Sequence, residues 1–328
     1  MNSRLMNSGI VLGLLSGFAA TFPPLFSHVA MESEVFIMMV GFPFLAPLLS
    51  GFFRDFFGFL SALVIAIKQK KIKEALSVFK SGDGWKYALT IGLISSVSAI
   101  GLFMSIYFAG PIYGVTLSMT YPIVGAILSH FCMKNKLAKM GWVAVIFCVI
   151  GAILVTYTPN TTNYINLPLG IVFGLVSSFA FGLEGIVAEK NIGTVSDNVA
   201  VLIKYGTSAA LQLVFFMPFA LGTPSVGGYV ALGQCFLSFE IIAFFLVGFT
   251  SWCSFWFYVK GISLLGAPTT MALCMTNTLW NVLFSIILFG AVLSNINGVG
   301  IMVVFGGLLL LTYAQNIDAK KVARVQAI

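Results

Sequence analysis

Charged side chains are scarce in this sequence. They make up 8% of its 328 residues, whereas soluble domains contain about 25%. Hydrophobic residues account for 59% and the mean hydropathy is +1.03, which excludes a water-soluble fold. Because no stretch outside the apolar segments is long enough for a separate soluble domain, any function must be carried out within a membrane.

Residues suited to metal, redox or phosphate chemistry are also few. The five cysteines show no CxxC spacing, and the two histidines, His28 and His130, lie far apart. There is no Gly-x-x-x-x-Gly-Lys motif, and Asp55 and Glu184 are the acids clearly inside apolar segments. We therefore expect no metal, no cofactor and no built-in ATPase. The clustered acids and bases that a membrane enzyme needs are missing as well, so we expect no enzymatic activity.

Long apolar runs predict an all-α integral membrane protein, because about 20 apolar residues are needed to cross a bilayer as a helix. Residues 35–46 form either part of an eleventh helix or an outer connection. The first run has no small-residue cleavage site and is interpreted as a retained helix. The ten predicted spans are residues 8–29, 47–67, 87–108, 114–133, 140–157, 168–189, 199–221, 236–259, 268–289 and 297–315.

The net charge of +7 follows from the placement of lysines in short loops. With ten spans and both termini inside, these loops fall on the cytoplasmic side, as expected for a protein of the inner (cytoplasmic) membrane. The charge therefore indicates orientation and does not indicate a nucleic-acid partner. The run from Lys68 to Lys73 also favours contact with anionic lipid headgroups.

The chain contains an internal repeat. Residues 9–19 and 170–180 are identical at eight of eleven positions with a shift of 161, and Gly151 and Gly307 match at a shift of 156. This predicts two five-helix repeats, residues 8–157 and 168–315. Because five is odd, the second repeat enters the membrane from the opposite side, an architecture typical of secondary transporters.

Several features together resemble the EamA-type members of the drug/metabolite transporter superfamily. They are the two five-helix repeats, the Gly-rich start of the first span, Arg54 early in the second, Tyr121-Pro122 in the fourth and a glycine-punctuated last helix. The resemblance covers nearly the whole chain. It implies a ten-helix transporter of small organic metabolites.

A narrower similarity is to bacterial choline permeases of that superfamily. It rests on Phe181-Gly-Leu-Glu184-Gly, Arg54-Asp55-Phe56 and the run from Leu279 to Phe284 that contains Trp280. The chain departs from those permeases at Ala20 and Phe181, where they carry tryptophans. The resemblance implies a cationic amine such as choline as substrate.

Glu184 is the most informative single residue, because a carboxylate inside a span is costly unless it is paired, hydrated or functional. It is expected to act as a counter-ion for a cationic substrate or as a proton-coupling group. The alternative is a structural ion pair with Lys190 or Lys204, although Glu189 is the expected partner of those lysines. In the repeat, Glu184 aligns with Pro23, and Pro23-Pro24 are predicted to break the first span and open it toward substrate.

Other candidates for substrate binding are aromatic and amide side chains within spans. Trp252 and Phe255 share a helix face with Trp256 and form either a cation-binding wall or an interface belt. For Arg54, anchoring is favoured over binding a substrate carboxylate, and it need not pair with its neighbour Asp55. The full predicted set is Glu184, Phe181, Trp280, Asn277, Asn281, Tyr121, Trp252, Phe255 and Tyr258.

The predicted function is secondary active transport of a small organic metabolite by alternating access, with a coupling proton or ion. An exporter of amino acids or other amphipathic metabolites and a non-transporting membrane scaffold are the alternatives. Gly306-Gly307 permits close helix packing, either in a homodimer or within one chain.

Overall fold

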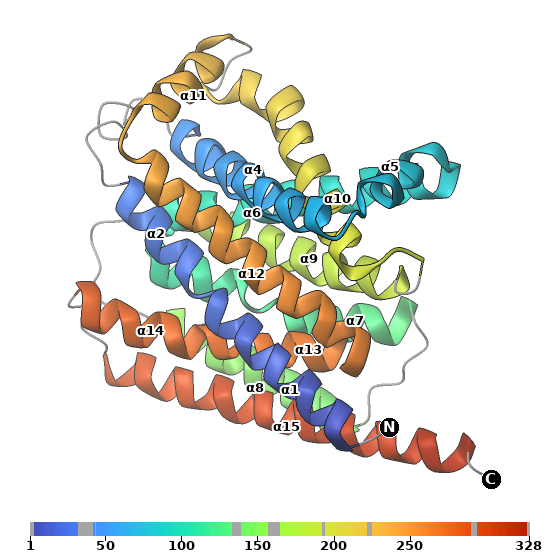
Figure 1. Ribbon diagram of the computed structural model, residues 1–328. Helices are drawn as coiled ribbons and strands as arrows, with labels where there is room; N and C mark the ends of the chain where they lie inside the picture. The colour runs from blue at the N-terminus through green and yellow to red at the C-terminus, as the bar shows by residue number, and fades with distance from the viewer. Residues whose placement is uncertain are drawn as a thin grey trace.

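The computed structural model describes residues 3–326 apart from 32–41, 43, 133–138, 157–164, 192–193, 222–224 and 290–293. The described elements are helices (Figure 1), which confirms the predicted all-α class. In chain order they are α1 (Ser3–Ala19), α2 (Phe22–Met31), α4 (Leu45–Lys68), α5 (Ile72–Lys80), α6 (Gly82–Ser118), α7 (Tyr121–Cys132), α8 (Lys139–Thr156), α9 (Leu167–Lys190), α10 (Asp197–Leu211), the π-helix η1 (Gln212–Phe216), the 3₁₀-helix η2 (Met217–Phe219), α11 (Gly227–Leu237), α12 (Ile241–Leu265), α13 (Ala267–Cys274), α14 (Thr276–Phe289) and α15 (Asn295–Gln326).

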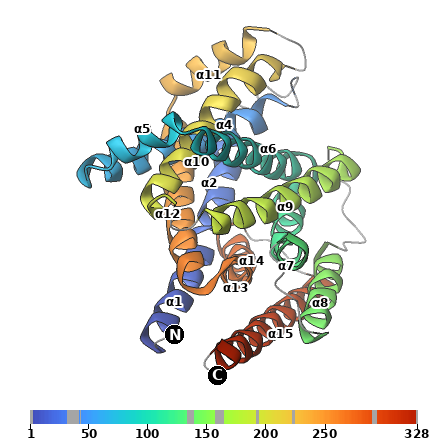
Figure 2. The same cartoon turned by 90° about the vertical axis from the view of Figure 1, so that its right-hand side faces the viewer.

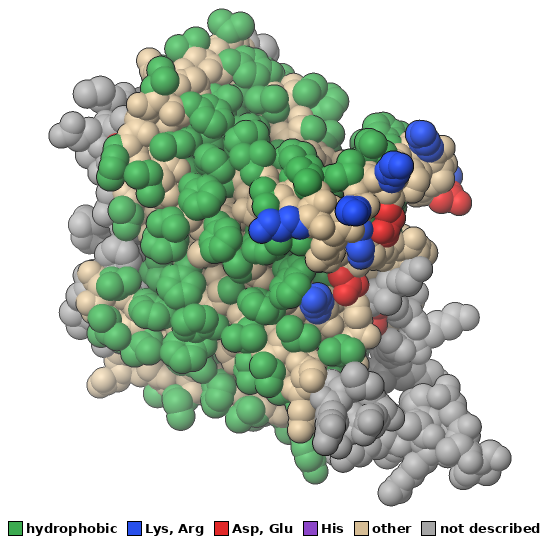
Figure 3. Space-filling model, viewed as in Figure 1, with side chains coloured by type: hydrophobic (Ala, Val, Ile, Leu, Met, Phe, Trp, Pro, Cys, Tyr) green, Lys and Arg blue, Asp and Glu red, His purple; other side chains and the backbone are tan. Residues whose placement is uncertain are grey.

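Seven helical segments of the described chain are long and apolar enough to cross a membrane. Three shorter apolar helices, 113–129, 139–151 and 298–307, coincide with the remaining predicted spans. Apolar side chains cover most of the face seen in Figure 3, whereas charged side chains gather at one end around α5. Helices suit this setting because they satisfy their own backbone hydrogen bonds in lipid. The chain is thus a multi-pass membrane protein, while the count of ten spans stays a prediction.

The first predicted span is broken in the turn that precedes Pro23 and Pro24. Helix α1 ends at Ala19, and Pro23 and Pro24 are the second and third residues of α2. A proline is tolerated in the first turn of a helix, where its missing N–H has no partner to lose. The break therefore precedes the prolines, at residues 20–21. The carbonyls of Ala19 and Ala20 receive no N–H from positions 23 and 24, so α1 cannot continue.

Two glycines bend the chain in the same way. Gly110, inside α6, has φ 79° and ψ 164°, and Gly266, between α12 and α13, has φ 81° and ψ 162°. This combination is open to glycine because a Cβ would clash with the backbone. The two positions are 156 residues apart, the same shift that relates the later parts of the repeat. Eight residues after each glycine the helix ends again, at Ser118 and Cys274.

Two segments expected as loops are helical. The stretch between the second and third predicted spans contains α5, and the stretch between the seventh and eighth contains most of α11. As a correction, the eighth predicted span therefore does not begin at residue 236: α11 is 11 residues long, too short to cross a bilayer, and α12 starts at Ile241. Of residues 35–46, positions 35–41 and 43 lie outside the described residues, and α4 begins at Leu45.

Small residues let α6 and α9 approach closely. A Cβ on Gly170 would meet Ala109 at 2.4 Å, and one on Gly174 would meet Ser105 at 2.8 Å. Ser105 Oγ also donates to the Gly170 carbonyl at 2.7 Å. In a membrane, where apolar burial gives little drive for helix association, such contacts and interhelical hydrogen bonds hold helices together.

Helices α8 and α15 pack side by side at the edge of the bundle (Figures 1 and 2). A Cβ on Gly151 would meet Val304 at 2.6 Å, and one on Gly307 would meet Cys148 at 2.7 Å. The two contacts are equivalent under the internal repeat, because its shift of 156 residues relates Gly151 to Gly307 and Cys148 to Val304. Gly307 is therefore occupied in packing within one chain.

Candidate functional site

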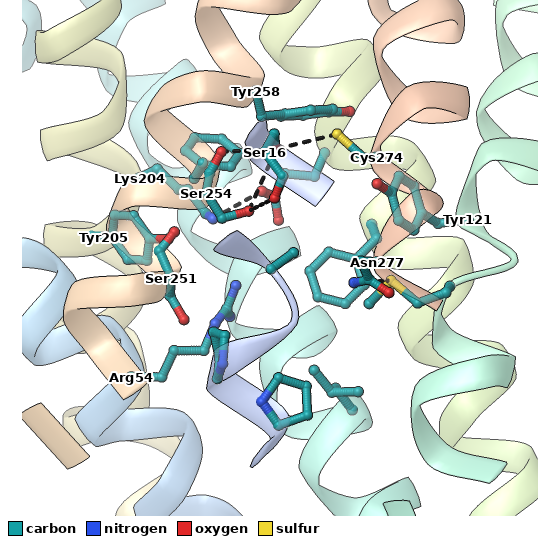
Figure 4. Close-up of a pocket in the computed structure, with 18 residues that line it drawn as sticks. Ser16, Arg54, Tyr121, Lys204, Tyr205, Ser251, Ser254, Tyr258, Cys274 and Asn277 are labelled. Carbon is teal, nitrogen blue, oxygen red and sulfur yellow. Dashed lines mark hydrogen bonds and ion pairs between the residues drawn. The ribbon is translucent and has the colours of Figure 1, made fainter. Parts of the chain in front are cut away.

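A buried cavity of about 90 Å³ lies among helices from both halves of the chain, beside the break between α1 and α2 (Figure 4). It is far smaller than the roughly 300–1,000 Å³ of typical small-molecule sites. Its lining combines aromatic rings, hydroxyl groups and three charged side chains. The lining residues are Ser16, Ala20, Pro23, Pro24, Arg54, Leu102, Met119, Tyr121, Phe181, Glu184, Lys204, Tyr205, Ser251, Ser254, Phe255, Tyr258, Cys274 and Asn277.

Most of the side chains singled out in the sequence come together at this cavity. Those that line it are Glu184, Phe181, Asn277, Tyr121, Phe255, Tyr258, Pro23 and Pro24. Those that do not are Trp280, Asn281 and Trp252. Their part in binding a substrate, or in gating, stays a prediction.

Two side chains of α14 point elsewhere. Trp280 is 37% exposed, and its ring packs edge-on against Phe18 with centroids 5.2 Å apart. Asn281 is buried, but its Nδ2 donates to the carbonyl of Asn277 one turn earlier, at 3.1 Å. Asn277 itself reaches the cavity, and its Nδ2 lies 3.1 Å from Met119 Sδ.

The aromatic residues of α12 divide between two sides of the helix. Phe255 and Tyr258 line the cavity with Ser251 and Ser254, a stripe at i, i+3, i+4 and i+7. Trp252 and Trp256 instead pack against each other, with ring centroids 6.4 Å apart. Trp252, Phe255 and Trp256 therefore do not share one face as predicted. Phe255 lines the cavity, whereas Trp252 and Trp256, one turn apart, lie beside the residues that line it.

Lys204 occupies the centre of the charged part of the cavity. Its Nζ lies 3.0 Å from Glu184 Oε1, 3.5 Å from the ring centroid of Phe255 and 4.3 Å from that of Tyr205. Both members of the ion pair are nearly inaccessible to solvent. Glu184 Oε2 in addition accepts a hydrogen bond from Ser98 at 3.3 Å.

The expected partner of the lysines, Glu189, does not contact Lys204. Glu189 instead accepts a hydrogen bond from the backbone of Ala267, where α13 begins and its free N–H groups attract a carboxylate. The packing of α9 against α10 and α12 thus decides the pairing. The interpretation of Glu184 as a member of an ion pair with Lys204 fits the geometry, and this pair lies inside the cavity.

Arg54 is also brought to the cavity, from α4 (Figure 4). Its Nη1 lies 3.3 Å from Asp55 Oδ1, although adjacent helical residues need not pair, and its guanidinium lies 5.8 Å from the Phe181 ring centroid. Asp55 does not line the cavity. Its Oδ2 accepts hydrogen bonds from Ser208 and, at 2.7 Å, from Gln212.

Several donors around the cavity have unused hydrogen-bonding capacity. Within the described part of the chain, Arg54 Nη1, Lys204 Nζ, Ser251 Oγ and Tyr258 Oη are buried and have no hydrogen-bond partner of good geometry. A buried polar group without a partner is costly. Each of the two cations has a buried acid beside it, Asp55 for Arg54 and Glu184 for Lys204, but Asp55 lies outside the lining, which therefore holds two cations and one acid.

The serines whose hydroxyl groups line the cavity could not be recognised as site residues from the sequence. Ser16 Oγ donates to the Ser254 carbonyl at 2.9 Å, and Ser254 Oγ donates to the Ser16 carbonyl at 3.0 Å, which joins α1 to α12. Cys274 Sγ lies 3.2 Å from Ser16 Oγ. Serine is common in apolar helices, so nothing in the spacing set these two apart, whereas a lone lysine at position 204 within an apolar run was a usable signal.

Comparisons with known proteins bear on the class of this molecule. Residues 7–157 match the model of the EamA-like transporter family. GDP-fucose transporter 1 of Dictyostelium discoideum is 23% identical over 306 residues, which covers 87% of this chain and 77% of that protein.

One solved crystal structure, described only as that of a protein, has a TM-score of 0.64, covering 94% of this chain and 98% of its own at 14% identity. That similarity concerns the fold alone. Taken with the apolar helices, the matches support a membrane transporter of small solutes and not an enzyme. The match of residues 7–157 to the EamA-like transporter family confirms the predicted resemblance to EamA-type members of the drug/metabolite transporter superfamily.

Proposed function

We propose that this protein is a secondary transporter that moves a small organic anion or zwitterion across the cytoplasmic membrane by alternating access. The observation that carries the proposal is the pair of buried cations that line the cavity, Arg54 and Lys204, whose Nη1 and Nζ atoms contact acids in ion pairs but make no hydrogen bond of good geometry. A carboxylate or phosphate accepts several such bonds, and charge-assisted bonds are about twice as strong as neutral ones.

The two cations come from matching places in the two halves. Arg54 lies on α4 and Lys204 on α10, the second described span of each predicted repeat. A substrate carboxylate between them would contact both halves at once. GDP-fucose, which the name of the Dictyostelium relative gives as its cargo, is also an anion. Amino acids, an alternative from the sequence, suit the cavity because their ammonium group has an acceptor in Glu184.

A cationic amine such as choline is the second candidate, favoured by Glu184 and the rings of Phe255 and Tyr258. These are the groups that recognise quaternary ammonium ions. In the described conformation Lys204 already contacts Glu184 and the Phe255 ring. A choline-like substrate would have to displace Lys204, which is why the anion is the first candidate.

Alternating access between two inverted five-helix repeats is supported by matched packing. The α6–α9 contact has its counterpart in α12–α1, and α4–α12 has its counterpart in α10–α6. The equivalent bends at Gly110 and Gly266 agree with this. The chain ends and α5 lie at one end of the bundle (Figure 1), as expected if both termini and the basic loop are cytoplasmic.

A proton is the proposed coupling ion, and Glu184 is its carrier. An anionic substrate that draws Lys204 away would leave Glu184 without its counter-ion in a region of low dielectric, where an unpaired charge is costly. Substrate and proton would then bind together. The predicted homodimer has less support, because Gly307 packs within the chain, although a Cβ built on Gly306 would meet no other atom of the described residues within 4 Å.

The proposal is tested by ligand-induced thermal stabilisation, which grows as RT ln(1 + [L]/Kd), on a panel of organic acids, amino acids, nucleotide sugars and amines. We expect a carboxylate- or phosphate-bearing hit that is lost in Arg54→Gln and kept in Lys260→Gln. Lys260 is the matched control, because its Nζ lies over the Trp256 ring at 3.7 Å and it does not line the cavity.

The hit is then tested for uptake and proton flux in proteoliposomes. Transport that persists in Glu184→Gln without proton flux supports the coupling role. A quaternary amine that binds Arg54→Gln as well as wild type would overturn the anion assignment. Binding without any flux in either direction would favour the scaffold alternative.

A further inference from the structure

A second cavity lies apart from the charged one, between α5 and the outer surfaces of α4, α6 and α10. It has a volume of about 480 Å³ and an almost entirely apolar lining. We call it the α5 groove. It is lined by Phe59 of α4, Ile72, Leu76 and Phe79 of α5, Trp85 of α6 and Phe215 of η1, among others.

Helix α5 turns its apolar face toward this groove, and that face stays partly exposed. Ile72, Leu76 and Phe79, at i, i+4 and i+7, line the groove, and Leu76 is 58% exposed. Lys73 and Lys80, seven residues apart, lie together along one edge of that face, at about 80–100° from its centre by the 100° turn per residue. A short basic helix with an open apolar face is typical of one that lies in a membrane interface.

The groove continues along α10 away from α5. Its lining there runs from Leu202 to Phe215, which at 1.5 Å per residue is about 20 Å. One leaflet of the hydrocarbon core is about 15 Å thick. Phe215, at the far end, is 61% exposed. The groove therefore has the length of a lipid acyl chain and opens toward the lipid-facing surface.

The end of the groove next to α5 is strongly basic. Residues 68–86 contain six lysines and two acids, a net charge of +4. Both acids are engaged, because Glu74 accepts a hydrogen bond from the Ser196 backbone at 2.9 Å and Asp83 lies 3.4 Å from Lys86 Nζ. Figure 3 shows the basic side chains gathered here beside an otherwise apolar face.

We propose that the α5 groove is a binding site for an anionic phospholipid, with one acyl chain along α10 and the phosphate group at Lys73 and Lys80. Lysine stems lie along apolar surface while their ammonium groups stay at the headgroup level. The surplus positive charge selects an anionic lipid over a zwitterionic one. This site is independent of the transported substrate.

The test is native mass spectrometry of the detergent-purified protein after exchange with equal amounts of phosphatidylglycerol and phosphatidylcholine. We expect wild type to retain phosphatidylglycerol preferentially. Because each lysine near a membrane surface contributes about fivefold to anionic lipid affinity, the double variant Lys73→Gln/Lys80→Gln should lose most of that preference. The control double variant Lys139→Gln/Lys190→Gln, which removes the same charge at exposed lysines elsewhere, should keep it.

The acyl-chain part of the site is tested separately. Ala210 is exposed and lines the groove, so Ala210→Trp should fill it and release the lipid, whereas Val172→Trp on the exposed face of α9 should not. Equal retention of the two lipids by wild type would overturn the proposal. Retention of phosphatidylglycerol by Ala210→Trp would also overturn it, because the headgroup contact would then not depend on the groove.

Discussion

Removing Lys204 should destabilise the protein by leaving Glu184 buried without its counter-ion. The two side chains are 1% and 3% exposed and their charged atoms are 3.0 Å apart. Breaking a buried ion pair from one side costs about 3–5 kcal/mol. With an unfolding entropy of about 2.1 cal/mol/K per residue, a chain of 328 residues has about 0.7 kcal/mol/K. Lys204→Met should therefore lower Tm by about 4–7 °C.

The ion pair is separated from other effects by a double-mutant cycle. Glu184→Gln alone should also destabilise, whereas Lys204→Met/Glu184→Gln removes both charges and should lose much less than the sum of the single variants, with a coupling of about 2 kcal/mol. Thermal unfolding followed by tryptophan fluorescence, in one detergent, gives all four values. Lys260→Met is the control and should change stability by less than about 1 kcal/mol. Additive single effects would refute the pairing.

Three further outcomes follow from the packing. Gly266→Ala should lower the free energy of unfolding by roughly 1–3 kcal/mol, because Gly266 has φ 81°. Gly306→Ala, where an added Cβ meets open space, should leave that free energy unchanged or raise it, and thermal unfolding compares the two variants. Gly307→Leu should force α15 away from Cys148 on α8 and cost at least about 1–3 kcal/mol, which chemical denaturation in detergent measures, and an unchanged midpoint would contradict the described packing. Trp280→Ala should lower stability but leave the Kd of the transported ligand unchanged, because its ring lies outside the cavity; a weaker Kd in a ligand titration would place Trp280 in the site.

The helical spans could be predicted because each is a long apolar run, and that signal depends only on local sequence. The form of the breaks within them could not. A proline pair disturbs the helical turn that precedes it, but it also starts a helix well, so the sequence does not say whether the helix only kinks or ends and begins again. The bend at Gly110 needs glycine, yet the sequence contains 33 glycines, most of them used for close packing.

The candidate site was predictable to the extent that charge in an apolar run is conspicuous. Glu184 and Lys204 stand out for that reason, but their mutual contact depends on how α9 and α10 pack. Local sequence favoured Glu189 as the partner of the lysines, because it lies beside Lys190. In the structure Glu189 instead contacts the start of α13. The serines that complete the cavity are chemically ordinary in apolar helices and acquire their place from tertiary structure alone.

The paired serines of α1 and α12 bear on how easily the two helices separate. Each hydroxyl donates to the backbone of the opposite helix, Ser16 to Ser254 and Ser254 to Ser16. A helical serine has a second acceptor within reach, the carbonyl four residues earlier in its own helix, here Leu12 or Thr250. When the helices part, both hydroxyls can rotate to these carbonyls, so neither proton is left without an acceptor in a region that water need not enter. Opening of this contact would therefore exchange two interhelical hydrogen bonds for two intrahelical ones.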